Sequence, residues 1–173
     1  ITVSGTRTAA VSDDVTFTGN LGTFTTTVAS GKTLTGDVAV LQGETIDGAG
    51  TVAVTDLDTD LDADLSTITA TSVTATFNAD GTFTGDLGTA AVTVASGKTL
   101  TADVAKLQGE TIAGAGTTAI TALNTDLDAD LSNIASTAVT ATFLLDGTFT
   151  GDLGTAVVTV TASKTFTATA AVA

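Results

Sequence analysis

The sequence predicts an all-β protein: a parallel β-solenoid, or β-helix, of about eight coils with a 66-residue super-repeat of three coils. The first observation is a hexapeptide, Thr82 to Leu87 (TFTGDL), whose near-copies return along the whole chain. The copies begin at positions 16, 33, 60, 82, 99, 126, 148 and 165. The differences between successive starts are 17, 27 and 22, and this triplet then repeats. Periods of this size are typical of solenoids and repeat arrays.

The second observation is that the hexapeptide alternates, as an extended strand does. One set of alternate positions is apolar or Gly in most copies, and the other set is Thr or Asp. We therefore expect two inward columns of side chains. One holds Phe17, Leu34, Leu61, Phe83, Leu100, Leu127 and Phe149; the other holds Leu21, Val38, Leu65, Leu87, Val104, Leu131 and Leu153.

Short helical turns also fit two parts of the repeat. In the DLDADLSTI segment and in DVAKLQ the apolar residues satisfy helical spacing as well. The residues concerned are Leu57, Leu61, Leu65 and Ile68, and Val104 and Leu107.

The whole chain, residues 1–173, is expected to form one repeat domain. Residues 1–29 are a partial repeat, 30–95 and 96–161 are full super-repeats identical at about fifty of 66 positions, and 162–173 begin the next. A second family of strands is expected at residues 52–54, 73–77 and 92–94, and again at 119–121, 139–143 and 158–160. The chain begins inside a strand, Ile1-Thr2-Val3, and stops inside another, Thr165 to Ala173, which predicts open strand edges at both ends.

Turn residues separate the expected strands. Ser30-Gly31, Ser96-Gly97, Gln42-Gly43, Asp80-Gly81 and Asp146-Gly147 are places where a positive φ costs little. An antiparallel sandwich is the alternative fold, since it also has several short strands separated by turns. The repeated triplet of unequal steps favours the solenoid, because only stacking requires the same hexapeptide in every unit.

Composition excludes several classes of function. Nineteen acidic residues against five basic ones cannot supply the positive patch that nucleic acid requires, and anionic membranes are disfavoured for the same reason. No apolar run approaches the roughly 18 residues of a membrane span. About a quarter of the chain is Thr, and Pro is absent, which favours uninterrupted strand ladders.

Carboxylates are the sharpest candidate site. Asp60, Asp62 and Asp64 are expected to point the same way along one strand, as are Asp126, Asp128 and Asp130. Stacking would also place the fifth hexapeptide residue of each copy in one column, namely Asn20, Asp37, Asp64, Asp86, Asp103, Asp130 and Asp152. Calcium binds six to eight oxygens, so converging carboxylates could hold it. A plain solubilising acidic face is the alternative, and it predicts weak divalent binding at most.

We expect no enzymatic activity and no cofactor other than calcium. The chain has no His, Cys or Tyr, so nucleophilic triads cannot form in their usual arrangements. Glu44 and Glu110 occupy equivalent QGETI positions, and paired acids can hydrolyse glycosides. Without Trp or Tyr to stack on sugars, these two residues are better interpreted as parts of solvated turns.

The Thr-x-Thr pairs, for example Thr82 and Thr84, would form an outward ladder. Such a ladder resembles the flat face of solenoid ice-binding proteins. In every third copy, however, aspartates replace both threonines, at Asp60 and Asp62 and at Asp126 and Asp128. This charged interruption argues against a flat, regularly hydrated plane.

The segments TVASGKTLTADVAKLQGETIAGAGTTAIT and LDADLSNI resemble the Thr/Ala/Gly/Asp-rich repeats of long bacterial surface and secreted proteins, including adhesin-like stalks. The resemblance implies a secreted or cell-surface location and a structural or adhesive role. The leading hypothesis is a non-enzymatic rod, stalk or filament segment that continues into further repeats or stacks end to end on copies of itself. The alternative is a solenoid that binds ice or a calcium-dependent surface.

Overall fold

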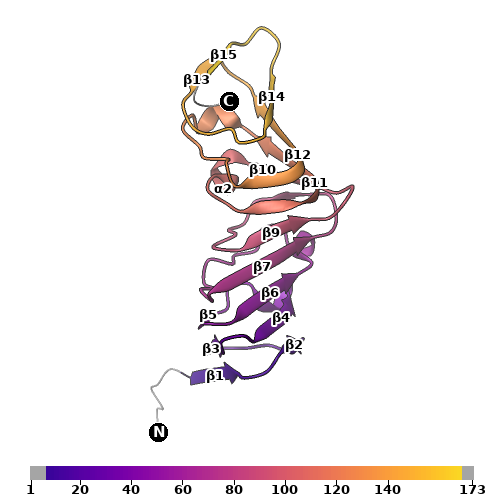
Figure 1. Cartoon of the computed structure of the whole chain (residues 1–173), viewed down its shortest axis with the longest axis vertical. Helices are drawn as coiled ribbons and strands as arrows, with labels where there is room; N and C mark the ends of the chain where they lie inside the picture. Colours follow the sequence, from indigo (N-terminus) through magenta and orange to yellow (C-terminus); the bar gives the residue numbers. More distant parts are fainter. Residues whose placement is uncertain (1–6, 169–173) are drawn as a thin grey trace.

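The computed structural model describes residues 7–168, which form a tall column of stacked coils (Figure 1). Strands make up 49% and helices 9% of these residues, and the strands wind through about nine turns of a β-solenoid. Every strand pair in residues 7–168 is parallel. The predicted fold class is confirmed, and the antiparallel sandwich is wrong.

The elements alternate between strands and short turns. The strands are β1 Arg7–Val11, β2 Val15–Phe17, β3 Phe24–Val28, β4 Thr33–Asp37, β5 Ile46–Gly48, β6 Thr51–Thr55, β7 Ser72–Phe77, β8 Gly81–Phe83, β9 Ala91–Val94, β10 Thr99–Asp103, β11 Ile112–Thr121, β12 Ile134–Phe143, β13 Gly147–Phe149, β14 Val157–Val160 and β15 Phe166–Ala168. The helices are α1 Val38–Leu41 and α2 Val104–Leu107, and the 3₁₀ turns are η1 Leu57–Thr59 and η2 Leu123–Thr125. The second family of strands is thus confirmed.

A ten-stranded sheet runs the height of the column in the order β14-β12-β11-β9-β7-β6-β4-β2, with β10 and β8 attached beside this path. A second sheet, β1-β3-β5, forms another wall at the N-terminal end, and β13 pairs with β15 at the C-terminal end. Figure 1 shows these strands crossing the column one above another.

The stacking register differs from the hexapeptide spacing. Partner residues lie 17 to 22 positions apart, from Arg7 and Phe24 to Ile46 and Ile68. Leu34 pairs with Val52 and not with Leu61. The longest predicted step, from Thr33 to Asp60, is therefore not a single coil, because β6 lies between the two hexapeptides.

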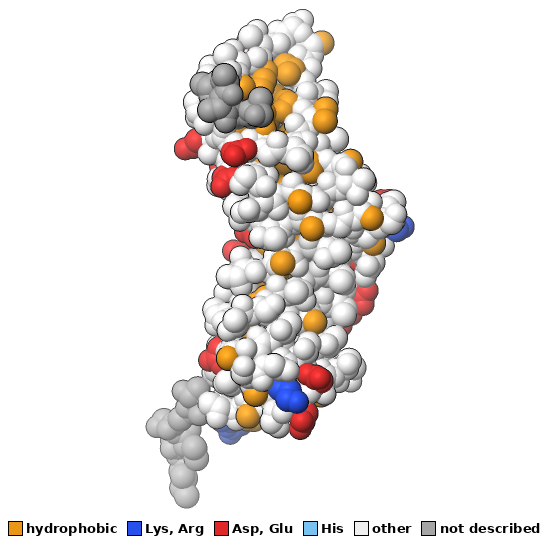
Figure 2. Space-filling model, viewed as in Figure 1, with side chains coloured by type: hydrophobic (Ala, Val, Ile, Leu, Met, Phe, Trp, Pro, Cys, Tyr) orange, Lys and Arg blue, Asp and Glu red, His pale blue; other side chains and the backbone are white. Residues whose placement is uncertain are grey.

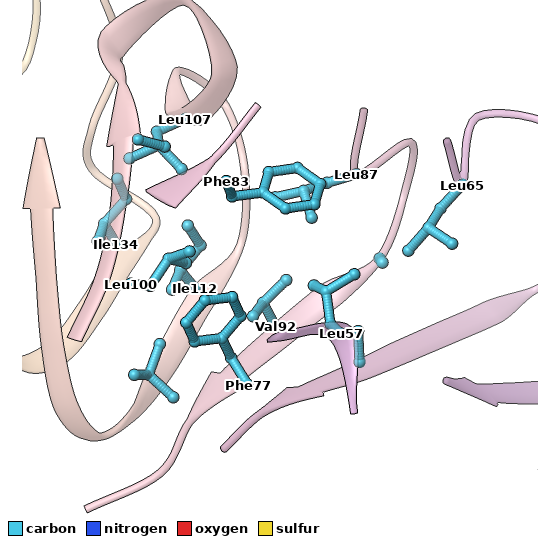
Figure 3. Packing of buried hydrophobic residues seen from close by; sticks show 14 of the residues in the cluster. Leu57, Leu65, Phe77, Phe83, Leu87, Val92, Leu100, Leu107, Ile112 and Ile134 are labelled. Carbon is cyan, nitrogen blue, oxygen red and sulfur yellow. The ribbon is translucent and has the colours of Figure 1, made fainter. Parts of the chain in front are cut away.

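The interior holds the predicted apolar residues. Nine of the fourteen are buried, and the other five, Phe17, Leu21, Leu61, Leu127 and Leu153, are partly buried against the same core. In Figure 3 the rings of Phe77 and Phe83 point into the interior among aliphatic side chains that include Leu57, Leu87 and Val92. The inward assignment is confirmed, although the register shift means that Phe83 stacks on Ala102 and not on Leu100.

The predicted Ser-Gly and Gln-Gly turns are confirmed, and the predicted Asp-Gly turns are wrong. Gly31, Gly97 and Gly43 have φ between 66° and 71°. Gly81 and Gly147 instead begin strands β8 and β13. At Gly81 the requirement is space, since a Cβ there would lie 2.8 Å from Cδ2 of Leu61.

Helical turns occur where DVAKLQ predicts one and only briefly near DLDADLSTI. Asp37 caps α1 and Asp103 caps α2, each accepting a hydrogen bond from the backbone N–H two residues later at 2.8 and 3.0 Å. Side-chain oxygens are favoured at this position because they satisfy an otherwise free helix N–H. DLDADLSTI itself, residues 60–68, has no helical residue, and only η1, Leu57–Thr59, precedes it.

Both chain ends lie partly outside the described residues. The predicted strand Ile1-Thr2-Val3 falls outside them, whereas β15 confirms a strand within Thr165 to Ala173. No helix in residues 7–168 has the length and apolarity needed to cross a membrane.

Candidate functional site

The predicted acidic strands are turns. Residues 60–65 contain a turn and a single bridge, Asp64 to Asp86, and the equivalent bridge joins Asp130 to Asp152. Asp60, Asp62 and Asp64 therefore do not line one face of a strand, and neither do Asp126, Asp128 and Asp130. The prediction fails because residues 61 and 62 form a turn, and strand-like pairing is limited to three backbone hydrogen bonds that link Leu61, Ala63 and Leu65 to the neighbouring coil.

The predicted single column of fifth-position residues is also wrong. Asp64 and Asp86 are neighbours on one wall, but Asp37 and Asp103 end strands that pair with Thr55 and Thr121 on the main sheet. The aspartates thus belong to two separate positions, and each has a local role. Asp37 and Asp103 are helix caps, and Asp64 and Asp86 hold turns.

Hydrogen bonds fix the turn aspartates. Asp64 Oδ1 accepts from Ser66 N at 2.9 Å and Ser66 Oγ at 2.6 Å, and Asp130 repeats both distances with Ser132. The Ser66 hydroxyl, followed by the Ser66 N–H, lowers the pKa of Asp64, and Ser132 does the same for Asp130. A carboxylate that accepts two such bonds is favoured in its charged form.

Other acidic groups differ between the two super-repeats. Gln42 Nε2 donates a hydrogen bond to Asp60. At the equivalent position, burial raises the pKa of Asp126, the carboxylates of Asp128 and Asp103 raise it further, and the backbone N–H of Asp128 partly offsets the rise. Within residues 7–168, no three carboxylates gather in a geometry that would hold a metal ion. Calcium binding at these aspartates remains a prediction.

Glu110 lies in a small polar cavity of about 160 Å³, lined also by Asp86 and Lys106. Burial raises the pKa of Glu110, and the charge of Asp86 adds to the rise. Asn20 and Val40 are the equivalents of Asp86 and Lys106 one super-repeat earlier, so this constellation belongs to one coil. Glu110 is half-buried, and it is therefore not the fully solvated turn residue that we expected.

The central columns of the outward face of the main sheet are rich in Thr and contain no charged residue, and Figure 2 shows few charged side chains over the middle of the column. One column reads Thr16, Thr35, Ala53, Thr74, Ala91, and another Thr82, Thr101, Ala119, Thr140, Val157. The expected interruption by Asp60 and Asp62 is wrong, because β6 takes the place assigned to those residues. The Thr ladder is therefore longer and less charged than the hexapeptide spacing predicts.

An apolar cavity of about 320 Å³ opens at the N-terminal end, and sequence reasoning did not find it. Its lining includes Val11, Val15, Phe17, Leu21 and Thr26. Thr26 is fully buried, and its Oγ1 has no hydrogen-bond partner within the described part of the chain. The available signal was Thr26 itself, since its equivalent in the next super-repeat is Val92.

Comparisons with protein-family models, with curated proteins and with solved structures gave no match. Functional interpretation therefore depends on the geometry of the coils, their outward face and their ends.

Proposed function

We propose that this chain is a non-enzymatic structural segment of an extracellular rod, stalk or filament. The observation that supports it most is the continuous parallel stack, in which coils bond to the coils before and after them. Such a stack lengthens by adding coils without changing its cross-section. The acidic, Thr-rich surface suits a secreted or cell-surface location, since high net charge keeps an exposed rod soluble.

End-to-end association follows from the same design. Within residues 7–168, β1 pairs only with β3, β2 only with β4, and β14 only with β12. Unpaired strand edges are templates for pairing with another chain. We propose that the rod continues at such edges, through further repeats or through copies.

Concatenation tests the rod. Chains carrying one, two and three additional copies of residues 30–95 should lengthen by about 16 Å per copy, because 66 residues at 17 to 22 residues per coil make a little over three coils at ~4.8 Å each. Small-angle X-ray scattering should show this growth at a constant cross-sectional radius. Particles that become compact as copies are added would contradict the proposal.

Ice binding is the second candidate, and the charge-free Thr columns support it. A flat ladder of hydroxyl and methyl groups at regular spacing can order water across the sheet. Thermal hysteresis of the purified chain tests this function. If the face binds ice, Thr74→Lys should abolish hysteresis, whereas Thr84→Lys, which lies outside these columns, should not. Absence of hysteresis in the unmodified chain would eliminate it.

Calcium binding is tested by calorimetric titration. Because the turn aspartates are already engaged with Ser66 and Ser132, we expect no site tighter than about millimolar, the weak end of extracellular calcium modules. Stoichiometric micromolar binding, lost in Asp62→Asn, would establish the calcium site instead.

A further inference from the structure

One contact between coils occurs twice in the interior with nearly the same geometry. The N–H groups of Thr84 and Asp86 donate to Leu61 O and Ala63 O at 2.7 and 2.9 Å, and Leu65 N donates to Asp86 O at 2.8 Å. The second copy joins residues 127–131 to residues 150–152 at 2.7, 3.0 and 2.8 Å. In each case a DLDADL segment covers a TFTGDL segment.

A glycine makes this contact feasible. A Cβ on Gly85 would lie 2.1 Å from Ala63 O, and one on Gly151 would lie 2.1 Å from Ala129 O. No side chain fits at that distance, so the fourth hexapeptide position must be Gly wherever a DLDADL segment covers it. The first-repeat copy at Gly36 has no such contact, and Ala102 stands at its equivalent position.

The N-terminal end retains the receiving half of this contact. Thr18, Gly19 and Asn20 are the equivalents, one super-repeat earlier, of the receiving residues Thr84 to Asp86. A Cβ on Gly19 would meet only the ring of Phe17, at 3.0 Å. The N–H groups of Thr18 and Asn20 make no backbone hydrogen bond within residues 7–168. Gly19 therefore leaves space for a covering coil, although residues 7–168 contain no coil that covers it.

The apolar cavity lies beside this edge. In the interior, Leu61 packs against Gly81 and Phe77 at the equivalent place. At the N-terminal end Val11 occupies the position equivalent to Phe77, and Val15 the position equivalent to Gly81. A cavity of about 320 Å³ is present there. Phe17 and Leu21 line it, as their equivalents Phe83 and Leu87 line the interior. The cavity has room for leucine side chains of an incoming segment.

Charge distinguishes the end from its interior copies. Asp64 faces Asp86 across one bridge, and Asp130 faces Asp152 across the other. Asn20 replaces the receiving aspartate, and its Oδ1 already accepts from Gly22 N at 2.6 Å. Its amide N–H groups, which make no hydrogen bond within residues 7–168, can donate to an incoming carboxylate, and one like-charge contact is removed.

We propose that the edge Thr18–Leu21 and the adjoining cavity form a docking site for a DLDADL coil. The incoming Leu and Ala carbonyls accept from Thr18 and Asn20, and the leucines enter the cavity. The preceding strand of the incoming coil adds to β1, as β6 adds to β7 in the interior. This inference rests on the proposed rod function, for which it names the coil that joins at this end.

The test uses the full chain and a fluorescent peptide with the sequence of residues 51–68. Anisotropy titration should show saturable binding at one site per chain. Gly19→Ala should weaken binding by more than about tenfold, with the melting temperature of the chain unchanged. A control peptide with serine in place of its three leucines should not bind.

A matched variant tests the equivalent contact in the interior, between residues 60–65 and 82–87. Gly85→Ala should lower the melting temperature markedly, because its Cβ would clash with Ala63 O of the covering coil, which belongs to the same chain. If Gly19→Ala also disturbs folding, Thr18→Pro is the second variant. It removes the N–H of an exposed residue that would donate to the peptide, and it should weaken peptide binding as strongly. No saturation up to about 1 mM, or equal binding by both Thr18 and Gly19 variants, would overturn the docking site. The concatenation experiment would still decide the rod independently.

Discussion

The two super-repeats, residues 30–95 and 96–161, differ in their interior and surface chemistry while keeping the same coil contacts. Both preserve the DLDADL turn, the glycine that it covers and the aspartate caps. The hydrogen bonds between these segments agree within 0.1 Å between the copies. The comparison indicates that backbone register depends on a few glycines, leucines and aspartates, whereas other positions can vary.

The interior differs most at one pair. Thr118 and Ser136 are buried, and their hydroxyls lie 2.7 Å apart in a hydrogen bond. The first super-repeat has Val52 and Ala70 at these positions, both buried. A hydroxyl pair and an apolar pair therefore occupy the same interior site.

The surface differs in charge and apolarity. Residues 30–95 carry ten carboxylates and one lysine, and residues 96–161 carry seven carboxylates and two lysines. Asn78 and Ala79 become Leu144 and Leu145, which are 48% and 54% exposed. These substitutions lie away from the shared backbone contacts, so the fold tolerates them.

The largest expected effect comes from a position that both copies share. Phe83→Ala should lower the free energy of unfolding by about 3–5 kcal/mol, because it leaves a cavity among buried side chains. Chemical denaturation measures this, with Thr84→Ala as a nearly neutral control on the outward face. Equal sensitivity at the two positions would refute the inward assignment.

The hydroxyl pair should give the next largest effect. Thr118→Val alone leaves the Ser136 hydroxyl buried without a partner and should cost about 1–3 kcal/mol. Adding Ser136→Ala recreates the pair of the first super-repeat and should recover most of that loss. A double-mutant cycle measures the coupling, and additive costs would show that the two hydroxyls do not depend on each other.

Thr26→Val should stabilise the chain by about 1 kcal/mol, since it removes an unpartnered buried hydroxyl and installs the residue found at position 92. Thr27→Val, at the exposed neighbouring position, is the control. If Thr26→Val is destabilising, the hydroxyl has a partner in solution.

The smallest effects concern pH. Because the folded-state pKa values of Glu110 and Asp126 are raised, protonation favours folding, and stability should rise as the pH falls from neutral towards those pKa values. The lowered pKa values of Asp64 and Asp130 act oppositely, so their contribution is lost as the pH falls below the ordinary value of 3.8. Thermal melting at several pH values should show a maximum in mild acid. Glu110→Gln should raise the melting temperature at pH 7 more than Glu44→Gln does.

The sequence was sufficient to predict the fold class, the inward residues and the second family of strands. Those predictions rest on alternation and periodicity, which report local extended structure and repetition directly. It was not sufficient for the register, because related hexapeptides serve as a strand at Thr33–Asp37 and as a turn at Asp60–Leu65. Which one a copy becomes depends on the coil beneath it.

The candidate sites were less predictable for the same reason. Wrong register placed Asp60 and Asp62 on the Thr ladder and merged two kinds of aspartate into one column. The end cavity depends on what lies beside Thr18 and Gly19 in space, which a repeat pattern alone does not reveal. Differences between equivalent positions, such as Thr26 against Val92, were the usable signal.

Thiol cross-linking tests the stacking register most directly, and the absence of cysteine from the chain gives a clean background. In the variant Thr35→Cys with Ala53→Cys, both thiols lie on the outward face at paired positions of β4 and β6. A short bifunctional reagent should join them rapidly and without loss of fold. The variant Thr35→Cys with Asp62→Cys, which the hexapeptide spacing would bring together, should not cross-link within one chain. Efficient coupling of residues 35 and 62, with none between 35 and 53, would contradict the register in which β4 stacks on β6.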